Sequence, residues 1–230
     1  MDRIGRLNRF YYVLNLLENK IGKHTLANCD GKMNWPRQGI YFFFEEGEVR
    51  ETNGEPRVVR VGTHAVSSGS KTTLWNRLRT HKGSVSGKYS GGGNHRGSIF
   101  RLHIGTAIIN KHNIELNTWG KGSSAKSSTR KAEHSLEVAV SKKIRSMPFL
   151  WVKAEDDAGP QSIRKFIERN AIALLSNYQR PVIDGPSGNW LGLYCQNKFV
   201  RHSGLWNVDH VAEQYDPYFL EIFYQLVKDM

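Results

Sequence analysis

The sequence has few cysteines and no long apolar stretch. Its 230 residues include only Cys29 and Cys195, which are far apart and lack the spacing of metal ligands. We therefore expect no disulfide framework and no structural zinc, and a reducing compartment fits this usage best. No apolar run approaches the roughly 18 residues of a membrane span, and the first residues lack the layout of a signal peptide. These absences predict a cytoplasmic protein that does not enter a membrane.

Acidic residues are also scarce. Asp and Glu number 21 against 33 Lys and Arg, which gives a formal net charge of +12. The excess lies between residues 57 and 145 rather than in a tail. Such a charge favours a polyanionic partner over an acidic or neutral one, and a generically basic soluble protein is the plain alternative. We expect the lysines and arginines of residues 83–101 and 121–131 to contact phosphates.

The chain is long enough for one substantial core, and its patterns predict a small sheet flanked by helices. Two apolar runs, 40–44 and 58–61, flank Asn53-Gly54, a pair that favours a tight turn, so residues 39–62 are predicted to form a hairpin. Residues 98–109 read as a third strand. The predicted class is therefore α/β, with a mostly antiparallel three-stranded sheet. A short buried strand at 149–152 and helices over 6–20, 74–81, 130–146, 163–175 and 218–227 complete the assignment.

Short motifs with chemical potential occur in order along this framework. Gly39-Ile40-Tyr41 opens the hairpin and Arg60-Val61-Gly62 closes it. The next predicted helix carries Arg77 and His81, which project side by side because residues four apart share a helix face. A phenol, a guanidinium and an imidazole are thus expected to converge. Glu168 lies in the middle of a later apolar-striped helix.

These motifs resemble the GIY-YIG nuclease family, which combines two such strands with an arginine helix and a later glutamate helix. The first motif matches fully, the second keeps only its glycine, and the spacing of Arg77 and His81 is similar to the restriction-enzyme-like branch. The resemblance implies a nuclease domain over residues 36–192, a helical extension over 1–35, and a C-terminal extension over 193–230 packed on it. It also implies a metal-dependent endonuclease that hydrolyses DNA, with double-stranded DNA as the expected partner, in restriction or another form of genome defence.

The resemblance implies a role for each matching side chain. Tyr41 would act as general base through its phenolate or would orient the attacking water. Arg77 would clamp the scissile phosphate with its planar donor fork. His81 would take or relay a proton near neutral pH, since an unperturbed imidazole has a pKa of about 6.5. Glu168 would hold Mg²⁺ or Mn²⁺, because one carboxylate suffices for an ion that keeps several waters.

Two further positions belong to the implied catalytic set. Arg60 stands where the family has its second tyrosine. A cation there would favour the ionised form of Tyr41, or else the replacement marks a catalytically weakened member. Asn189 is the residue assigned as the family's closing asparagine.

Two rival functions remain beside the nuclease. One is a nuclease-like module that grips DNA or RNA without cutting it, and the other is a basic structural protein such as a ribosome-associated one. A metal requirement and strand scission separate the nuclease from both. A single site cuts one strand, so double-strand cleavage would need a dimer or sequential nicks.

Overall fold

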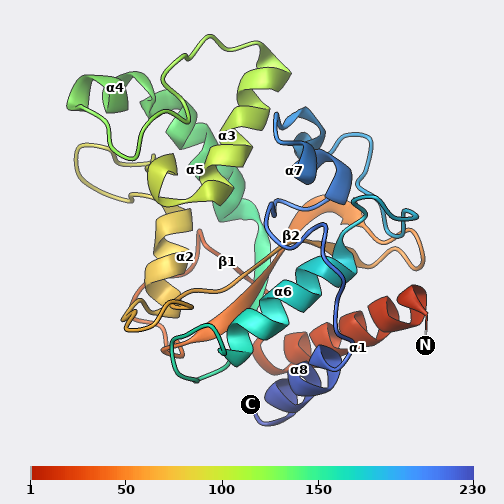
Figure 1. Ribbon diagram of the computed structural model, residues 1–230. Helices are drawn as coiled ribbons and strands as arrows, with labels where there is room; N and C mark the ends of the chain where they lie inside the picture. Colours follow the sequence, from red (N-terminus) through yellow and green to blue (C-terminus); the bar gives the residue numbers. More distant parts are fainter. Residues whose placement is uncertain (1) are drawn as a thin grey trace.

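The computed structural model describes residues 2–230 and contains one antiparallel four-stranded sheet between two layers of helices (Figure 1). The strand order is β1-β4-β2-β3. The strands are β1 (His24–Thr25), β2 (Gly39–Val49), β3 (Pro56–Gly62) and β4 (Pro148–Lys153). The helices are α1 (Arg3–Ile21), α2 (Leu74–Lys82), α3 (Ile99–His112), α4 (Ser127–Ala132), α5 (His134–Ser146), α6 (Ile163–Leu175), α7 (Lys198–Ser203) and α8 (Phe219–Lys228), with 3-10 turns η1 (His95–Gly97) and η2 (Leu191–Tyr194).

The predicted hairpin is confirmed. Strands β2 and β3 pair antiparallel, and Tyr41 lies opposite Gly62. Their connection is closed by a hydrogen bond from the Arg50 N–H to the Glu55 carbonyl (2.7 Å). Gly54 has a φ of +75°, a conformation that a glycine adopts without steric cost. The Asn-Gly pair was therefore a sound signal for this turn.

The predicted third strand at 98–109 is wrong, because the segment forms helix α3. Ser98 caps the helix by accepting the Arg101 N–H (3.3 Å), and Asn113 ends it in the left-handed region. The apolar residues of this short segment fit both the alternation of a strand and the periodicity of a helix. In the structure Phe100, Ile104 and Ala107 are buried, and their spacing is helical. The serine and asparagine caps were the signals that could have decided between the two.

Strand β4 takes the place of that missing strand in the sheet. It pairs with β2 from Gly39↔Lys153 to Phe43↔Phe149, and with β1 on its other side. The sheet therefore has four strands rather than three. The α/β class with helices on both faces is confirmed.

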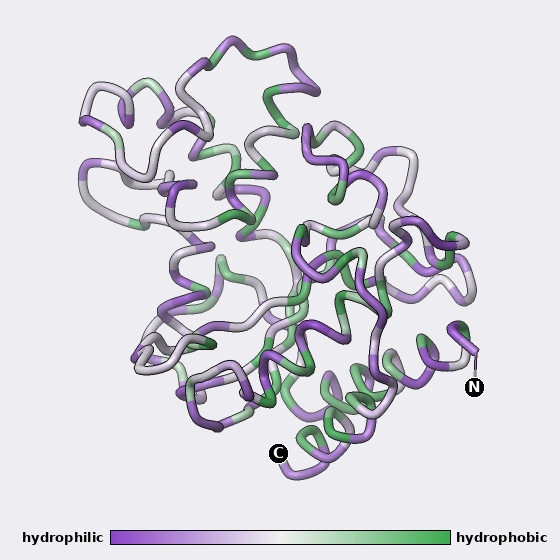
Figure 2. Tube along the Cα trace, in the orientation of Figure 1, coloured by the Kyte–Doolittle hydropathy of each residue, from purple (hydrophilic) through white to green (hydrophobic). Residues whose placement is uncertain are grey.

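Successive side chains along the strands point to opposite faces of the sheet and pack into two separate hydrophobic cores. Ile40 and Phe42 of β2 pack with α1, α6 and α8, whereas Tyr41 and Phe43 pack with α2, α3 and α5. Hydrophobic segments follow the strands and recur along the helices that face them (Figure 2). The chain termini contribute to the first core through α1 and α8, which lie side by side on one face of the sheet (Figure 1). Among residues 2–230, no helix combines the length and apolarity needed to cross a bilayer.

Candidate active site

Two glycines let the hairpin place a tyrosine ring flat against a neighbouring strand. A Cβ atom at Gly62 would lie 2.3 Å from the Cζ and Oη atoms of Tyr41. A Cβ atom at Gly39 would lie 2.5 Å from the carbonyl oxygen of Val152 on β4. Both distances are too short for contacts between non-bonded atoms, so the glycines of the two motifs are required by close packing. The Tyr41 ring is fully buried as a result.

The hydroxyl of Tyr41 is hydrogen-bonded to a buried histidine. It lies 2.8 Å from Nε2 of His81, and Nδ1 of His81 lies 2.8 Å from Oγ of Ser98. Burial, together with the charges of Arg77 and Arg60, holds the pKa of His81 well below its ordinary value. His81 is therefore neutral near pH 7, which corrects the expectation that it titrates there. The neutral imidazole can fix the orientation of the Tyr41 hydroxyl through their hydrogen bond. Its surroundings disfavour the uptake of a further proton by the imidazole itself.

Two guanidinium groups lie beside the Tyr41 hydroxyl. The hydroxyl raises the pKa of Arg77 against the effect of burial, with a smaller contribution from Glu168. Arg60 is buried over the Phe100 ring, 4.7 Å from its centroid, and donates to the Trp206 carbonyl (2.6 Å). Burial lowers the pKa of Arg60, and Tyr41 partly offsets this. The cation expected near Tyr41 from the altered second motif is thus present.

Glu168 reaches the same place from α6, whose first turn is capped by Ser162. Its Oε1 accepts the backbone N–H of Thr63 (3.0 Å), the residue that directly follows Gly62. Burial raises the pKa of Glu168, while Arg60 and the Thr63 N–H act in the opposite direction. Tyr41, Arg60, Arg77, His81 and Glu168 are therefore brought together, and we call them the Tyr41 cluster.

Unpartnered polar atoms surround the Tyr41 cluster. Nε of Arg60 and Nε of Arg77 are buried without a hydrogen-bond partner among the described residues. Nε2 of His64 and Nε2 of His103 are also buried without a partner. Burial lowers the pKa of each histidine to about 4, with smaller contributions from Arg77 at His64 and from Arg60 at His103. Buried donors and acceptors are nearly always paired in folded proteins, so a group of orphans indicates a place that a ligand or water completes. Two orphaned guanidinium N–H groups suit an anion.

Asn189 does not join the Tyr41 cluster. It is exposed and lines a different hollow with Glu45 and Glu48, toward the other end of β2. An asparagine that the sequence did not single out lies closer. Asn207 is buried and pairs through its amide with both backbone groups of Val61 (3.1 and 2.9 Å), next to Gly62. No local sequence pattern marks it, because its role depends on a loop that returns to the edge of β3.

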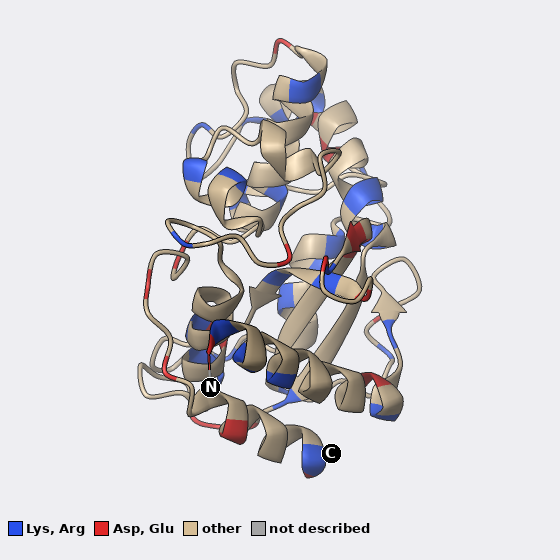
Figure 3. Ribbon diagram, turned by 90° about the vertical axis from the view of Figure 1, so that its right-hand side faces the viewer, with Lys and Arg blue, Asp and Glu red and all other residues tan. Residues whose placement is uncertain are grey.

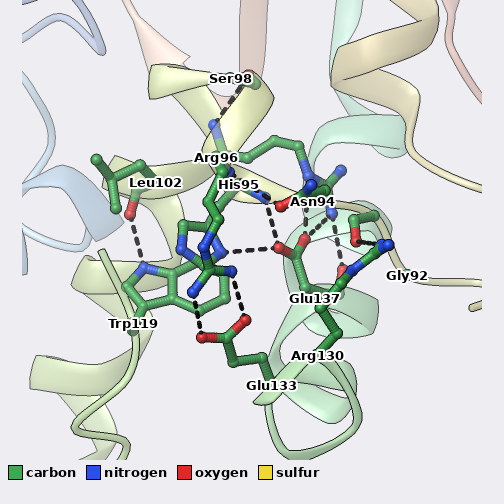
Figure 4. Close-up of polar contacts among 12 residues, drawn as sticks. Gly92, Asn94, His95, Arg96, Ser98, Leu102, Trp119, Arg130, Glu133 and Glu137 are labelled. Atoms are coloured by element: carbon green, nitrogen blue, oxygen red, sulfur yellow. Dashed lines mark hydrogen bonds and ion pairs between the residues drawn. The ribbon is translucent and has the colours of Figure 1, made fainter. Parts of the chain in front are cut away.

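Two arginines that the charge pattern assigned to phosphates are engaged elsewhere. Arg96 pairs with Glu133, and Arg101 pairs with Glu137, with all four side chains buried (Figure 4). His95 joins them, since its Nε2 accepts the Gly120 N–H (3.1 Å) and its Nδ1 therefore donates to Glu137 (3.0 Å). We call these five residues the Glu137 network. Lys and Arg residues are spread over helices on both sides of the sheet (Figure 3).

A metal ion could be held here only by the Glu168 carboxylate. No group of three or more His, Cys, Asp or Glu within residues 2–230 could bind a metal. One oxygen of Glu168 accepts the Thr63 N–H, and the other is not committed to a protein donor. A lone carboxylate suits Mg²⁺ or Mn²⁺, which take their other ligands from water and phosphate, and it does not suit zinc. The residues present thus fit the ion that the family resemblance implies.

The family assignment follows from comparison with family models. The model described as GIY-YIG domain matches residues 1–230, so the chain belongs to the GIY-YIG family, whose members are usually endonucleases. The family implies a nucleic-acid substrate. Comparisons with curated proteins and with solved structures give no match.

Proposed function

We propose that this protein is a metal-dependent endonuclease that hydrolyses DNA phosphodiester bonds, with Tyr41, Arg60, Arg77, His81 and Glu168 as its active site. The observation that carries the proposal is the meeting of Tyr41, Arg77 and Glu168 from β2, α2 and α6 around unpartnered guanidinium groups. Restriction or another genome-defence role, in the cytoplasm and on duplex DNA, is the setting we propose.

The chemistry assigns a distinct task to each group. Phosphodiester hydrolysis needs an oriented water, positive charge on the phosphoryl oxygens and help for the leaving oxygen. Tyr41, fixed by His81, orients or deprotonates the water, and Arg77 donates to the phosphate through its unpartnered Nε–H. Arg60 adds a second positive charge beside the Tyr41 oxygen. A Mg²⁺ or Mn²⁺ ion on Glu168 would supply Lewis-acid stabilisation of the leaving oxygen.

The second candidate is a module that binds nucleic acid without cutting it. It is favoured by Arg60 in place of the second motif tyrosine and by the complete burial of Tyr41. Both functions predict binding to DNA, but only the first predicts turnover.

Nicking of a supercoiled plasmid by the purified protein tests the proposal. We expect nicking with Mg²⁺ or Mn²⁺, none with chelator, and a loss of roughly 10²-fold or more in Glu168→Ala, because the several kcal/mol supplied by a metal is removed. Glu115→Ala, at an exposed glutamate after α3, is the control and should cut normally. Binding without turnover under either metal would favour the second candidate.

A further inference from the structure

A hollow of about 700 Å³ opens on the other side of α2 from the Tyr41 cluster. It lies between α2, the loop around residues 83–97 and the segment at Asp30 and Gly31. Ligand sites typically have volumes of roughly 300–1,000 Å³, so this hollow is large enough for a chemical group the size of a nucleotide. We call it the Arg79 hollow.

The Arg79 hollow is lined by more cations than carboxylates. Arg79, Lys82 and Arg130 line it, against Asp30 as the one carboxylate. None of the three cations forms an ion pair with a carboxylate in the described part of the chain. Hydroxyl and amide groups fill much of the remaining wall. The hollow beside Asn189 is the opposite case, because it holds three glutamates and its Lys143 is paired with Glu45 (2.6 Å).

Two of the three cations of the Arg79 hollow, Lys82 and Arg130, are held in place by the fold. Lys82 is only 9% exposed and donates to the Cys29 carbonyl (2.5 Å). Arg130 lies 4.0 Å from the centroid of the Tyr89 ring and donates to the Gly93 carbonyl (3.3 Å). Because these side chains are already ordered, less conformational entropy is lost when a ligand binds.

The aromatic wall of the hollow is fixed as well. Trp75 stacks on Trp35 with ring centroids 5.2 Å apart. Gly31 makes room for its indole, since a Cβ atom there would lie 2.8 Å from Nε1 of Trp75. The wall of the hollow formed by Trp75 is therefore preformed.

Helix α2 links the hollow to the proposed reaction centre. Successive residues of a helix are about 100° apart, so Arg77 and Arg79 point to nearly opposite sides of α2. Arg77 faces Tyr41, and Arg79 lines the hollow. A helix with its side chains is roughly 10–12 Å thick, and a duplex advances about 3.4 Å per base pair. A DNA backbone held at Arg77 would thus reach the hollow within a few nucleotides.

We propose that the Arg79 hollow binds a backbone phosphodiester of the nucleic-acid substrate, a few nucleotides from the scissile phosphate. The inference rests on the proposed function for the identity of the ligand. Arg79 and Arg130 contact the phosphate, and Lys82 adds charge at the floor. The site contributes to affinity and to the register of the strand, and it takes no part in bond cleavage.

Salt-dependent binding tests this proposal without any need for turnover. The probe is a short fluorescent DNA duplex titrated with protein in chelator at several KCl concentrations. Each cation that neutralises one duplex phosphate contributes about 0.9 to the slope of log affinity against log salt. We expect Arg79→Gln and Arg130→Gln each to reduce the slope by up to about this amount, and the double variant to reduce it further. Lys228→Gln removes an exposed cation on α8, on the opposite face of the sheet, and should leave the slope unchanged.

Cleavage kinetics separate a failure of this inference from a failure of the proposed function. If the wild type nicks DNA and the double variant keeps its salt slope, the hollow is not a phosphate site although the nuclease assignment stands. If the wild type never nicks DNA but the double variant loses slope, the phosphate site stands without the nuclease. Where both hold, the double variant should raise KM several-fold with kcat unchanged at saturating DNA.

Discussion

Two buried polar clusters lie on the same side of the sheet, and they differ in how completely their groups are paired. In the Glu137 network, none of the five charged or titratable residues has a buried atom without a partner. Around the Tyr41 cluster, Arg60 and Arg77 each retain an unpartnered guanidinium nitrogen. Both clusters contain two arginines, a histidine and at least one glutamate, so the kinds of residue alone do not tell them apart.

The difference in pairing indicates a difference in role. Although burial opposes it, hydrogen bonds from His95 and the charge of Arg101 lower the pKa of Glu137, so the network is ionised and internally neutralised. Such an arrangement joins η1, α3 and α5 and needs no outside group. The Tyr41 cluster has more positive than negative charge and incomplete hydrogen bonding. Positive charge and unpartnered donors are the features that an anion-binding site requires, which is the basis of the proposed role.

The largest effect is expected from a substitution that breaks the Glu137 network. Glu137→Ala would leave Arg101 fully buried without its counter-ion, which typically costs about 3–5 kcal/mol of the free energy of unfolding. Arg77→Gln, in the unpaired cluster, should change it by about 1 kcal/mol or less, because no ion pair is lost. Urea denaturation followed by circular dichroism measures both. Equal losses in the two variants would contradict the distinction between the clusters.

The expected proximity of Tyr41, Arg77 and His81 could be predicted from the sequence because its signals are local. The hairpin follows from its Asn-Gly turn, and Arg77 and His81 share a face whenever their segment is helical. Glu168 followed from the glutamate-helix resemblance, and the structure places it beside Arg77. Each of these residues could be placed once the helix or strand that carries it was predicted.

The sequence could not predict contacts that depend on distant partners. Arg96 and Arg101 were assigned to phosphates because their carboxylate partners lie 37 and 36 residues away along the chain. Asn189 was misplaced for the same reason, since the path of a loop decides which end of β2 it meets. Segment 98–109 was read as a strand because a short apolar pattern fits two periods.

A smaller effect concerns pH and compares two histidines on α3. Burial, with a contribution from Arg60, lowers the pKa of His103 to about 4. Between about pH 6.5 and this value the unfolded chain binds a proton that the folded protein excludes, so stability falls as the pH is lowered. The slope for one such group is at most about 1.4 kcal/mol per pH unit.

His103→Gln should therefore reduce the decline in the free energy of unfolding between about pH 6.5 and pH 4 by roughly 3 kcal/mol. The control is His112→Gln, which removes an exposed histidine from the last turn of the same helix and should leave the decline unchanged. Denaturant titrations across this pH range give the slopes. A decline of full size in His103→Gln would show that His103 is not excluded from protonation by the fold.

The smallest expected effect concerns Ser98, which connects the two clusters. Its Oγ lies 2.8 Å from His81 and also accepts the Arg101 N–H that begins α3. Ser98→Ala should cost about 1–2 kcal/mol of stability through the lost cap and the weakened His81 contact. If His81 positions Tyr41, nicking should slow by up to about tenfold while DNA affinity is unchanged, because one missing hydrogen bond is worth about 1.4 kcal/mol at most. Ser98→Thr keeps the hydroxyl and should restore both stability and rate. A variant that loses stability but nicks at the wild-type rate would confine Ser98 to the helix cap and remove His81 from the alignment of Tyr41.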